Sequence, residues 1–417
     1  MVHPEAGGAV GCARGPVRSA VDVAVVGGGI IGLAIAWRLA RSGRSVRLFD
    51  PAPATGATFA AAGMLAPVSE YHYQEDDLLP LMLASAARYP GFVAELAPDG
   101  AASGYRQTET LLVGVDHGDR QALADLHLVH RRLGLGAEPL TTRDAKAREP
   151  LLGARVTSAY RVLGDHQVDP RILASRLLDE LAAASAVEVV RERVVSLVHD
   201  DPADRESRIT GIRTDSGAVT AADEVVLANG LAARTIADLP GRLTLPLRPV
   251  YGDILRLRVP GELQPVLTAT VRGLVHGEPV YLVPRADGTL VVGATQREDG
   301  MAGVSAGGIL RLLRDAQEIL PAVADLELGE ATARARPATP DNAPLLGRVR
   351  STDGADVPGL IVATGFFRHG VLLAPVAADI CRDLIDGAAD DRWDAFRPDR
   401  FAPLHAVAVA TSERSIT

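Results

Sequence analysis

The chain has 417 residues, of which 47% are hydrophobic and 23% charged, and it carries a formal net charge of −9. A chain of this length can bury a large core and form two domains or more. Its negative charge, and the lack of a basic stripe with interleaved aromatic residues, argue against a general nucleic-acid binder. The two cysteines, Cys12 and Cys381, are too few for a disulfide framework or a metal site.

The N-terminal segment shows neither a secretory hydrophobic region nor a helical period, so we expect a disordered leader at residues 1–20. The apolar run at 23–37 is short and rich in glycine, which does not fit a membrane span. The sequence therefore predicts a cytoplasmic location and no membrane partner.

Residues 23–50 have the pattern of one βαβ unit. An apolar, β-branched stretch at Val23–Val26 predicts a strand, which the loop Gly27–Gly32 joins to an amphipathic helix that ends near Ser42. A second strand is predicted at Val46–Phe49. This strand–loop–helix–strand order is typical of a dinucleotide-binding fold.

The glycines of this loop each meet a requirement of dinucleotide binding. Gly27 permits the tight turn, Gly29 lets the backbone approach a pyrophosphate, and Gly32 lets the helix pack closely on the strand. The helix N-terminus offers N–H groups and a positive dipole to the phosphates. Asp50, at the end of the second strand, can accept hydrogen bonds from a ribose and disfavours a 2′-phosphate. FAD or NAD is therefore favoured over NADP.

The rest of the chain mixes helical spacing with short strands and turn signals. Helices are predicted at 76–98, 119–134, 171–184, 305–319 and 374–385, and strands at 108–113, 187–198, 208–214, 219–222, 224–228, 253–259, 280–284, 290–294 and 360–363. Residues 334–346 are interpreted as a proline-rich connection.

This order predicts an α/β fold, α+β overall, with a Rossmann-type nucleotide domain interrupted by an antiparallel-sheet substrate domain. A continuous NAD dehydrogenase would place its other Rossmann strands soon after the first pair, so the interruption favours a flavoprotein. We expect the FAD-binding domain at 21–90, 157–235 and 333–390, a helical insertion of the substrate domain at 91–156, its antiparallel sheet at 236–332, and a C-terminal tail at 391–417.

Four further segments, in this order, resemble the D-amino-acid oxidase superfamily of FAD enzymes, and most of all the glycine oxidases of thiamine biosynthesis. The resemblance covers the chain from about 21 to 387. The segments are AAAGMLAP at 60–67, VYLVPR at 280–285 together with VVGAT at 291–295, RPATPD at 336–341, and ATGFFRHGVLLAP at 363–375.

With the glycine fingerprint, the resemblance implies a non-covalently bound FAD. The small residues at 60–66 suit a backbone lying against a flat ring, and the glycine-rich loop before the last helix can direct N–H groups at a reduced flavin. The expected cofactor-binding residues are Gly27, Gly29, Ile30, Ile31, Gly32, Asp50, Pro51, Ala57, Thr58, Ala62, Gly63, Met64, Val194, Ala228, Gly230, Phe366, Phe367, Arg368, His369, Gly370, Val371 and Leu372.

Arg336 stands beside a proline in an otherwise uncharged stretch, and a rigidly held arginine is a good bidentate clamp for a carboxylate. By resemblance, Arg336 binds the substrate carboxylate and the hydroxyl of Tyr281 joins it there. Arg334, two residues earlier, is interpreted as an ordinary surface arginine.

Arg368 matches a family arginine that lies beside flavin and substrate, although it could instead pair with Asp341. The sequence departs from the family pattern in three places. Asp50 stands where Glu is usual, the segment 251–253 (Tyr-Gly-Asp) replaces a basic residue and Gln, and His369 stands where Asn is frequent. These departures bear on substrate choice more than on FAD binding.

The resemblance implies oxidative deamination of a small amino acid, with hydride transfer to FAD and reoxidation by O₂ to hydrogen peroxide. Glycine is the expected substrate, with sarcosine and D-alanine as further candidates, and the glyoxylate imine would serve thiazole assembly. A homo-oligomer is expected. A related oxidase or dehydrogenase, a non-catalytic flavin-binding subunit, and an NAD-dependent dehydrogenase stay open as alternatives.

Overall fold

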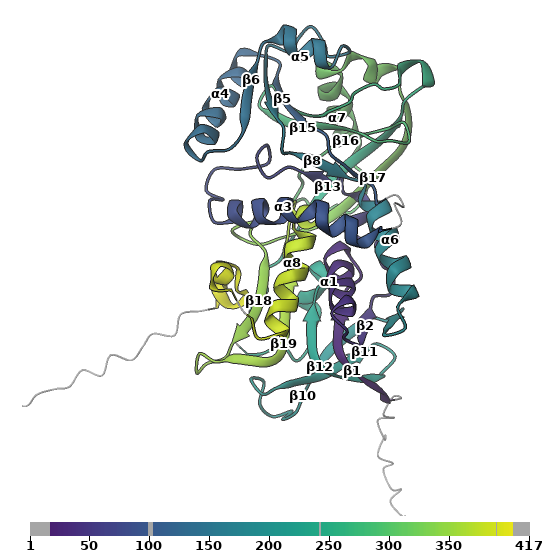
Figure 1. Ribbon diagram of the computed structural model, residues 1–417, viewed down its shortest axis with the longest axis vertical. Coiled ribbons are helices and arrows are strands. Elements are labelled where there is room, and N and C mark those ends of the chain that lie inside the picture. The colour runs from purple at the N-terminus through teal and green to yellow at the C-terminus, as the bar shows by residue number, and fades with distance from the viewer. Residues whose placement is uncertain (1–16, 99–102, 242, 389, 403–417) are drawn as a thin grey trace, which may run out of the picture.

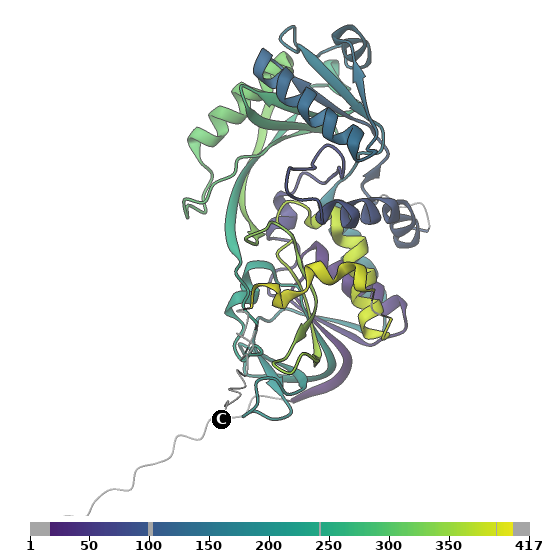
Figure 2. The ribbon, with the colours of Figure 1, turned by 90° about the vertical axis from the view of Figure 1, so that its left-hand side faces the viewer.

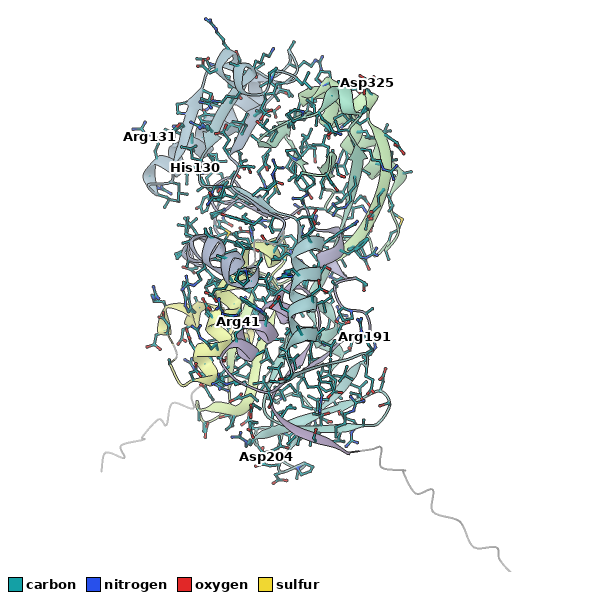
Figure 3. The ribbon with its side chains drawn as sticks, turned by 45° about the vertical axis from the view of Figure 1, so that its right-hand side comes forward. Arg41, His130, Arg131, Arg191, Asp204 and Asp325 are labelled. Atoms are coloured by element: carbon teal, nitrogen blue, oxygen red, sulfur yellow. The ribbon has the colours of Figure 1, made fainter. Side chains whose placement is uncertain are left out.

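Two eight-stranded sheets and a small three-stranded sheet organise the chain in a computed structural model that describes residues 17–98, 103–241, 243–388 and 390–402. Each large sheet forms the centre of one lobe (Figure 1). Arg41, Arg191 and Asp204 lie in the lobe of the first sheet, while Asp325 and the neighbours His130 and Arg131 lie in the lobe of the second (Figure 3).

The first sheet contains a parallel core in the order β19-β12-β1-β2-β9. Antiparallel strands extend it, with β10 and β11 beside β12 and β18 beside β19. The strands are β1 (Val17–Val26), β2 (Val46–Phe49), β9 (Val187–Val190), β10 (Val194–His199), β11 (Ile209–Thr214), β12 (Val219–Leu227), β18 (Leu345–Arg350) and β19 (Asp356–Thr364).

Four helices share a hydrophobic core with this sheet, which explains why its central strands read as continuous apolar runs. They are α1 (Ile30–Arg41), α3 (Leu78–Leu96), α6 (Pro170–Ala183) and α8 (Gly370–Ile385). Helix α6 begins one residue before its predicted start at 171. The carboxylate of Asp169 accepts the backbone N–H of Arg171 at 2.9 Å, and Pro170 occupies the first helical position.

The second sheet has the order β17-β13-β16-β15-β14-β5-β7-β6. Its strands are β5 (Thr110–Gly114), β6 (Ala137–Leu140), β7 (Ser158–Val162), β13 (Arg248–Arg258), β14 (Thr270–Val275), β15 (Glu278–Pro284), β16 (Thr289–Gly293) and β17 (Glu327–Ala338). The helices of this lobe are α4 (His117–Arg132), α5 (Thr142–Arg148) and α7 (Ala306–Ile319). The long strands β13 and β17 curve from this lobe towards the first (Figure 2).

Short elements complete the fold. The three-stranded sheet, β3-β8-β4, lies near the junction of the lobes (Figure 1). The remaining elements are α2 (Ala57–Ala60), β3 (Met64–Leu65), β4 (Tyr105–Arg106), β8 (His166–Val168), η1 (Gly230–Thr235), η2 (Gly261–Leu263), η3 (Pro321–Asp325), η4 (Asp391–Phe396) and η5 (Pro398–Phe401).

The predicted α/β class is confirmed, and several element boundaries need correction. Residues 17–20 of the expected leader belong to β1, whereas 1–16 lie outside the described residues, as does Cys12. The strand expected at 187–198 is two strands, β9 and β10, and the two expected at 219–222 and 224–228 are the single strand β12. Part of the expected C-terminal tail forms η4 and η5, and 403–417 lie outside the description.

Two proline-containing segments were misinterpreted from the sequence. Residues 334–338 end β17 instead of forming a connection, because β17 is an edge strand, where Pro337 needs no ladder partner for a missing N–H. Helix α8 begins at Gly370, not Ala374, although Pro375 lies inside it and cannot donate to the carbonyl of Val371. The hydroxyl of Tyr89 in α3 donates to that carbonyl at 2.6 Å, so the interrupted hydrogen bond is replaced.

The second sheet also differs from a purely antiparallel insertion. Strand β14 pairs with β5 in parallel, and β7, which falls in the expected nucleotide segment 157–235, pairs with β5 and β6 in the second sheet. The division of the chain into domains stays a prediction. In the part of the chain that the structure describes, no helix is both long and apolar enough to cross a membrane.

Candidate functional site

A cavity of about 450 Å³ is lined by residues of both large sheets. One part of its wall comes from the carboxyl ends of the parallel strands β1, β2, β12 and β19, which is where open α/β sheets bind ligands. The other part comes from β13, β15 and β17 of the second sheet, and the segment 56–64 completes it. Its volume falls within the usual range for small-molecule and cofactor sites.

The glycine loop forms the nucleotide end of the cavity. Gly27 has φ +107°, and a Cβ added there would lie 2.5 Å from the Cα of Asn229. A Cβ on Gly32 would lie 1.9 Å from the carbonyl oxygen of Gly27, so this position admits only glycine while helix α1 stays in place. The carboxylate of Asp50 accepts the N–H of Gly28 at 2.6 Å and fixes the loop.

The start of α1 faces the same cavity. The N-cap residue Gly29 has no side chain to cap the helix. The hydroxyl of Thr58 caps it instead by accepting the N–H of Ile30 at 3.0 Å. Thr58 therefore holds the segment 56–64 against the helix N-terminus. Both Gly29 and Thr58 line the cavity.

The segment of small residues at 60–64 is pinned by a buried arginine. Arg285 donates hydrogen bonds to the carbonyls of Ala62 and Val168 and to the side chain of Gln167. Burial lowers the pKa of Arg285 to about 10. A Cβ on Gly63, which has φ +69°, would lie 2.0 Å from the carbonyl oxygen of Val168. This part of the wall is thus firmly held and carries only small side chains at 60–63.

Arg336 on β17 and Tyr281 on β15 both line the cavity, and the strands β13 and β16 lie between them in the second sheet. The guanidinium of Arg336 packs against Gly252, where an added Cβ would lie 2.4 Å from Nη1 and Nη2, and Nη1 donates to the carbonyl of Thr295 at 3.3 Å. Among the described residues, no carboxylate lies within ion-pair distance of Arg336. An arginine with this surrounding is available for an anionic ligand.

The hydroxyl of Tyr281 reaches over Gly293, where a Cβ would lie 2.4 Å from its oxygen. Burial raises the pKa of Tyr281, so its hydroxyl stays protonated and can donate a hydrogen bond. Both clamp residues are therefore accommodated by a glycine on the adjacent strand, Gly252 for Arg336 and Gly293 for Tyr281.

Charged residues beside the clamp are matched with one another. Glu70, which lines the cavity, accepts from Arg272 at 2.5 Å, and Arg368 pairs with Glu75. The alternative partner considered for Arg368, Asp341, is wrong: Asp341 pairs with Arg400 at 2.9 Å instead.

His369 is buried next to this group, with Nδ1 4.0 Å from Glu70. Burial and then Arg368 lower its pKa well below the ordinary value, so its imidazole is neutral. Within the described part of the chain, neither ring nitrogen has a hydrogen-bond partner.

The structure brings most of the expected site residues to the cavity wall. Five do not line it: Gly32 packs on the loop, Pro51 is exposed, and Val194, His369 and Leu372 are buried behind the wall. The residues that do line it are Gly27, Gly29, Ile30, Ile31, Asp50, Ala57, Thr58, Ala62, Gly63, Met64, Ala228, Gly230, Tyr281, Arg336, Phe366, Phe367, Arg368, Gly370 and Val371.

The cavity wall also contains residues that were not among the expected site residues, among them Glu70, Asn229, Gly252 and Arg334. The sequence could have predicted Asn229 as a site residue, because it follows the carboxyl end of the parallel strand β12, where ligands of such sheets bind. Gly252 lies in the segment 251–253 that departs from the family pattern. No local signal marks Glu70, which reaches the cavity through the tertiary fold alone.

The residues at the cavity fit FAD. The side-chain oxygen Oδ1 of Asn229 is buried without a partner in the described residues, and it can accept a hydrogen bond from a polar ligand. The N-termini of α1 and α8 both contribute lining residues, which provides N–H donors at two places along the cavity. The glycine loop, Asp50 and Thr58 would hold the nucleotide, and the segment 60–64 with Phe366–Val371 would hold the flavin ring.

A family model described as "FAD dependent oxidoreductase" matches residues 22–384. The chain belongs to this family, and its cofactor is FAD.

Among relatives, the "Bifunctional protein ThiO/ThiG" of Synechocystis sp. is 34% identical over 92% of this chain and 55% of that protein, so the chain spans about half of its length. The "Glycine oxidase" of Geobacillus kaustophilus is 32% identical over 88% of this chain and 93% of that protein, and its crystal structure superposes with a TM-score of 0.79 over 93% and 99% of the two chains. The iminodiacetate oxidase of Chelativorans sp. BNC1 superposes with a TM-score of 0.78 at 28% identity, covering 90% and 98%.

Proposed function

We propose that the protein is a glycine oxidase, which oxidises glycine with bound FAD and O₂ to the glyoxylate imine and hydrogen peroxide. The observation that carries the proposal is the pair Arg336 and Tyr281, a cation without an acidic partner beside a protonated hydroxyl in the cavity that fits FAD. The similarity to glycine oxidase over nearly the full length of both chains supports the choice of substrate.

The two clamp residues would bind and orient the substrate. A carboxylate accepts two parallel hydrogen bonds from the fork of Arg336 and a third from Tyr281, which fixes the position of the α-carbon. The neighbouring charged side chains form two ion pairs, Glu70 with Arg272 and Glu75 with Arg368, so their charges are already balanced. Arg336 therefore offers a substrate carboxylate a positive charge that no acidic side chain in the described residues already matches.

The remaining wall would exclude water and support the developing charge. Ala62, Met64 and Ile254 belong to one buried hydrophobic cluster at the cavity, and their apolar side chains offer water no hydrogen-bond partner there. Gly370 and Val371, in the first turn of α8, direct the positive end of that helix at the cavity and stabilise negative charge there. When bound, FAD supplies the hydride acceptor.

Peroxide production by the purified holoenzyme tests the activity. We expect glycine to give the highest kcat/KM, with sarcosine, D-alanine and iminodiacetate as the comparison set, because the last is the named substrate of one similar structure. Reduction of a dye without peroxide would instead indicate a dehydrogenase. Oxidation of none of these amines would favour the non-catalytic flavoprotein.

The clamp is tested by Arg336→Ala. Loss of a charged hydrogen-bonding partner costs on the order of 2–5 kcal/mol, so the KM for glycine should rise roughly 30-fold or more while FAD stays bound. Arg336→Lys should recover only part of the loss, since an ammonium cannot reproduce the planar fork. The control is Arg258→Ala, because Arg258 lies on the same sheet with a side chain 71% exposed.

Three features stay proposals without a structural basis of their own. The glyoxylate imine would feed thiazole assembly, as the name ThiO/ThiG of a relative suggests, but that relative is nearly twice as long. A homo-oligomer and a cytoplasmic location are expected from the sequence. Size-exclusion chromatography with light scattering measures the oligomeric state.

A further inference from the structure

Strand β17 places two arginines on one wall of the cavity. Arg334 and Arg336 are two residues apart, so their side chains leave the same face of the strand about 7 Å from each other. Both line the cavity. Arg334 was interpreted from the sequence as a surface residue; it is exposed, and it also belongs to the cavity wall.

The side chain of Arg334 is held close to the nucleotide end. Its Nε donates to the carbonyl of Thr55 at 3.1 Å, and its guanidinium lies 5.7 Å from the ring centre of Phe59. Nη1 donates to the carbonyl of Ala333 at 2.8 Å. In the described part of the chain Nη2 has no partner, and no carboxylate pairs with Arg334.

The residues that hold Arg334 belong to the segment that caps α1. Thr55 lies three residues before Thr58, whose hydroxyl accepts the N–H of Ile30 in the first turn of that helix. Gly29, Gly56 and Thr58 line the cavity together with Arg334. The cation is therefore tied to the same short stretch of chain that faces the phosphate-binding end of the helix.

Charge balance at this end of the cavity calls for a cation. A diphosphate carries two negative charges, a helix N-terminus supplies about half a positive charge, and Asp50 adds a negative one. The other lining arginines are engaged elsewhere: Arg368 pairs with Glu75, and Arg336 packs on Gly252 in the second sheet. Among the described arginines that line the cavity, Arg334 is therefore the one that can supply the charge that the diphosphate lacks.

We propose that Arg334 binds a diphosphate oxygen of FAD and is a cofactor-binding residue of this protein. Its free Nη2 is the donor, and the contacts to Thr55 and Phe59 hold the guanidinium in place for it. This role does not depend on which amine is oxidised. Strand β17 then carries a binding residue for each ligand, Arg334 for the cofactor and Arg336 for the substrate carboxylate.

The Kd for FAD is measured by diluting the holoenzyme, because the fluorescence of FAD rises as it dissociates from the protein. Arg334→Ala should raise the Kd for FAD about 10- to 100-fold, the effect of losing one charged hydrogen bond, and Arg334→Lys should recover part of it. Arg258→Ala, the exposed arginine of the same sheet, should leave the Kd unchanged.

Competition with fragments of FAD shows whether Arg334 contacts the diphosphate or whether its loss distorts the whole binding site. ADP contains the diphosphate, and adenosine does not. In the wild type, ADP should displace FAD better than adenosine, and Arg334→Ala should reduce the advantage of ADP by a similar factor. An unchanged Kd for FAD would overturn the proposal, and so would an equal loss for ADP and adenosine. A variant that changes only the KM of the amine would show that Arg334 acts on the substrate instead.

Discussion

Gly252→Ala tests whether the position of the Arg336 guanidinium, and not merely its charge, decides carboxylate binding. The added Cβ would lie 2.4 Å from both Nη1 and Nη2 and 2.6 Å from Cζ. Ordinary van der Waals contact begins near 3.4 Å, so the end of the arginine side chain must move by about 1 Å. Gly252 does not have a positive φ, so alanine fits the backbone of β13.

A displaced guanidinium loses its charged hydrogen bonds to the substrate. At about 1.5–3 kcal/mol, the loss corresponds to a roughly 10- to 150-fold weaker binding of a carboxylate. The fold should be unaffected, because the atoms that move are the free end of a long side chain and alanine has the better strand propensity. We therefore expect a binding defect without a stability defect.

The assay titrates the holoenzyme with acetate, which has the carboxylate but no amine, and follows the flavin absorbance, together with the KM for glycine and the melting temperature. Gly261→Ala is the matched control, since no atom lies within 4 Å of a Cβ at that position. If Gly252→Ala binds acetate and glycine as the wild type does, the guanidinium of Arg336 is not the clamp.

Three further predictions address the cofactor, the packing and the pH dependence. Gly32→Ala should yield protein without flavin, measured by the flavin absorbance after purification, because its Cβ meets backbone at 1.9 Å. Tyr89→Phe should cost about 1–3 kcal/mol in urea unfolding, since it leaves the carbonyl of Val371 buried without a donor. The hydrogen bonds from Arg171 lower the pKa of Glu330 to about 2. Its stabilising effect is thus present above its ordinary pKa and lost as the pH falls towards 2, so Glu330→Gln should be less stable than the wild type at pH 6 and approach it below pH 3.

The parts of the fold that depend on neighbouring residues could be predicted from the sequence. The βαβ unit at 23–50 and the start of α6 follow from local patterns, because turns, caps and the amphipathic period act over a few residues. The start of α8 could not be predicted in this way. Its first turn depends on a hydroxyl from Tyr89, which is distant in sequence.

The same distinction applies to the site. The glycine loop and the stretch around Arg336 carry motifs that identify them. Glu70 and Arg334 line the cavity because the fold brings the segment after β3 and the edge strand β17 together there. Such a tertiary contact between distant segments cannot be predicted from a single sequence. The sequence assigned Arg336 to the site and Arg334 to the surface, and only the fold shows that both line the cavity.

The replacement of a broken hydrogen bond in α8 has a consequence for the redox chemistry. Ser85 and Tyr89 of α3 donate to the carbonyls of Leu372 and Val371, and so they keep the first turn of α8 from fraying. No residue of α3 lines the cavity. Because the first turn of α8 would direct its dipole at the flavin, we expect substitutions along the buried face of α3 to shift the reduction potential of the flavin while every cavity residue stays the same.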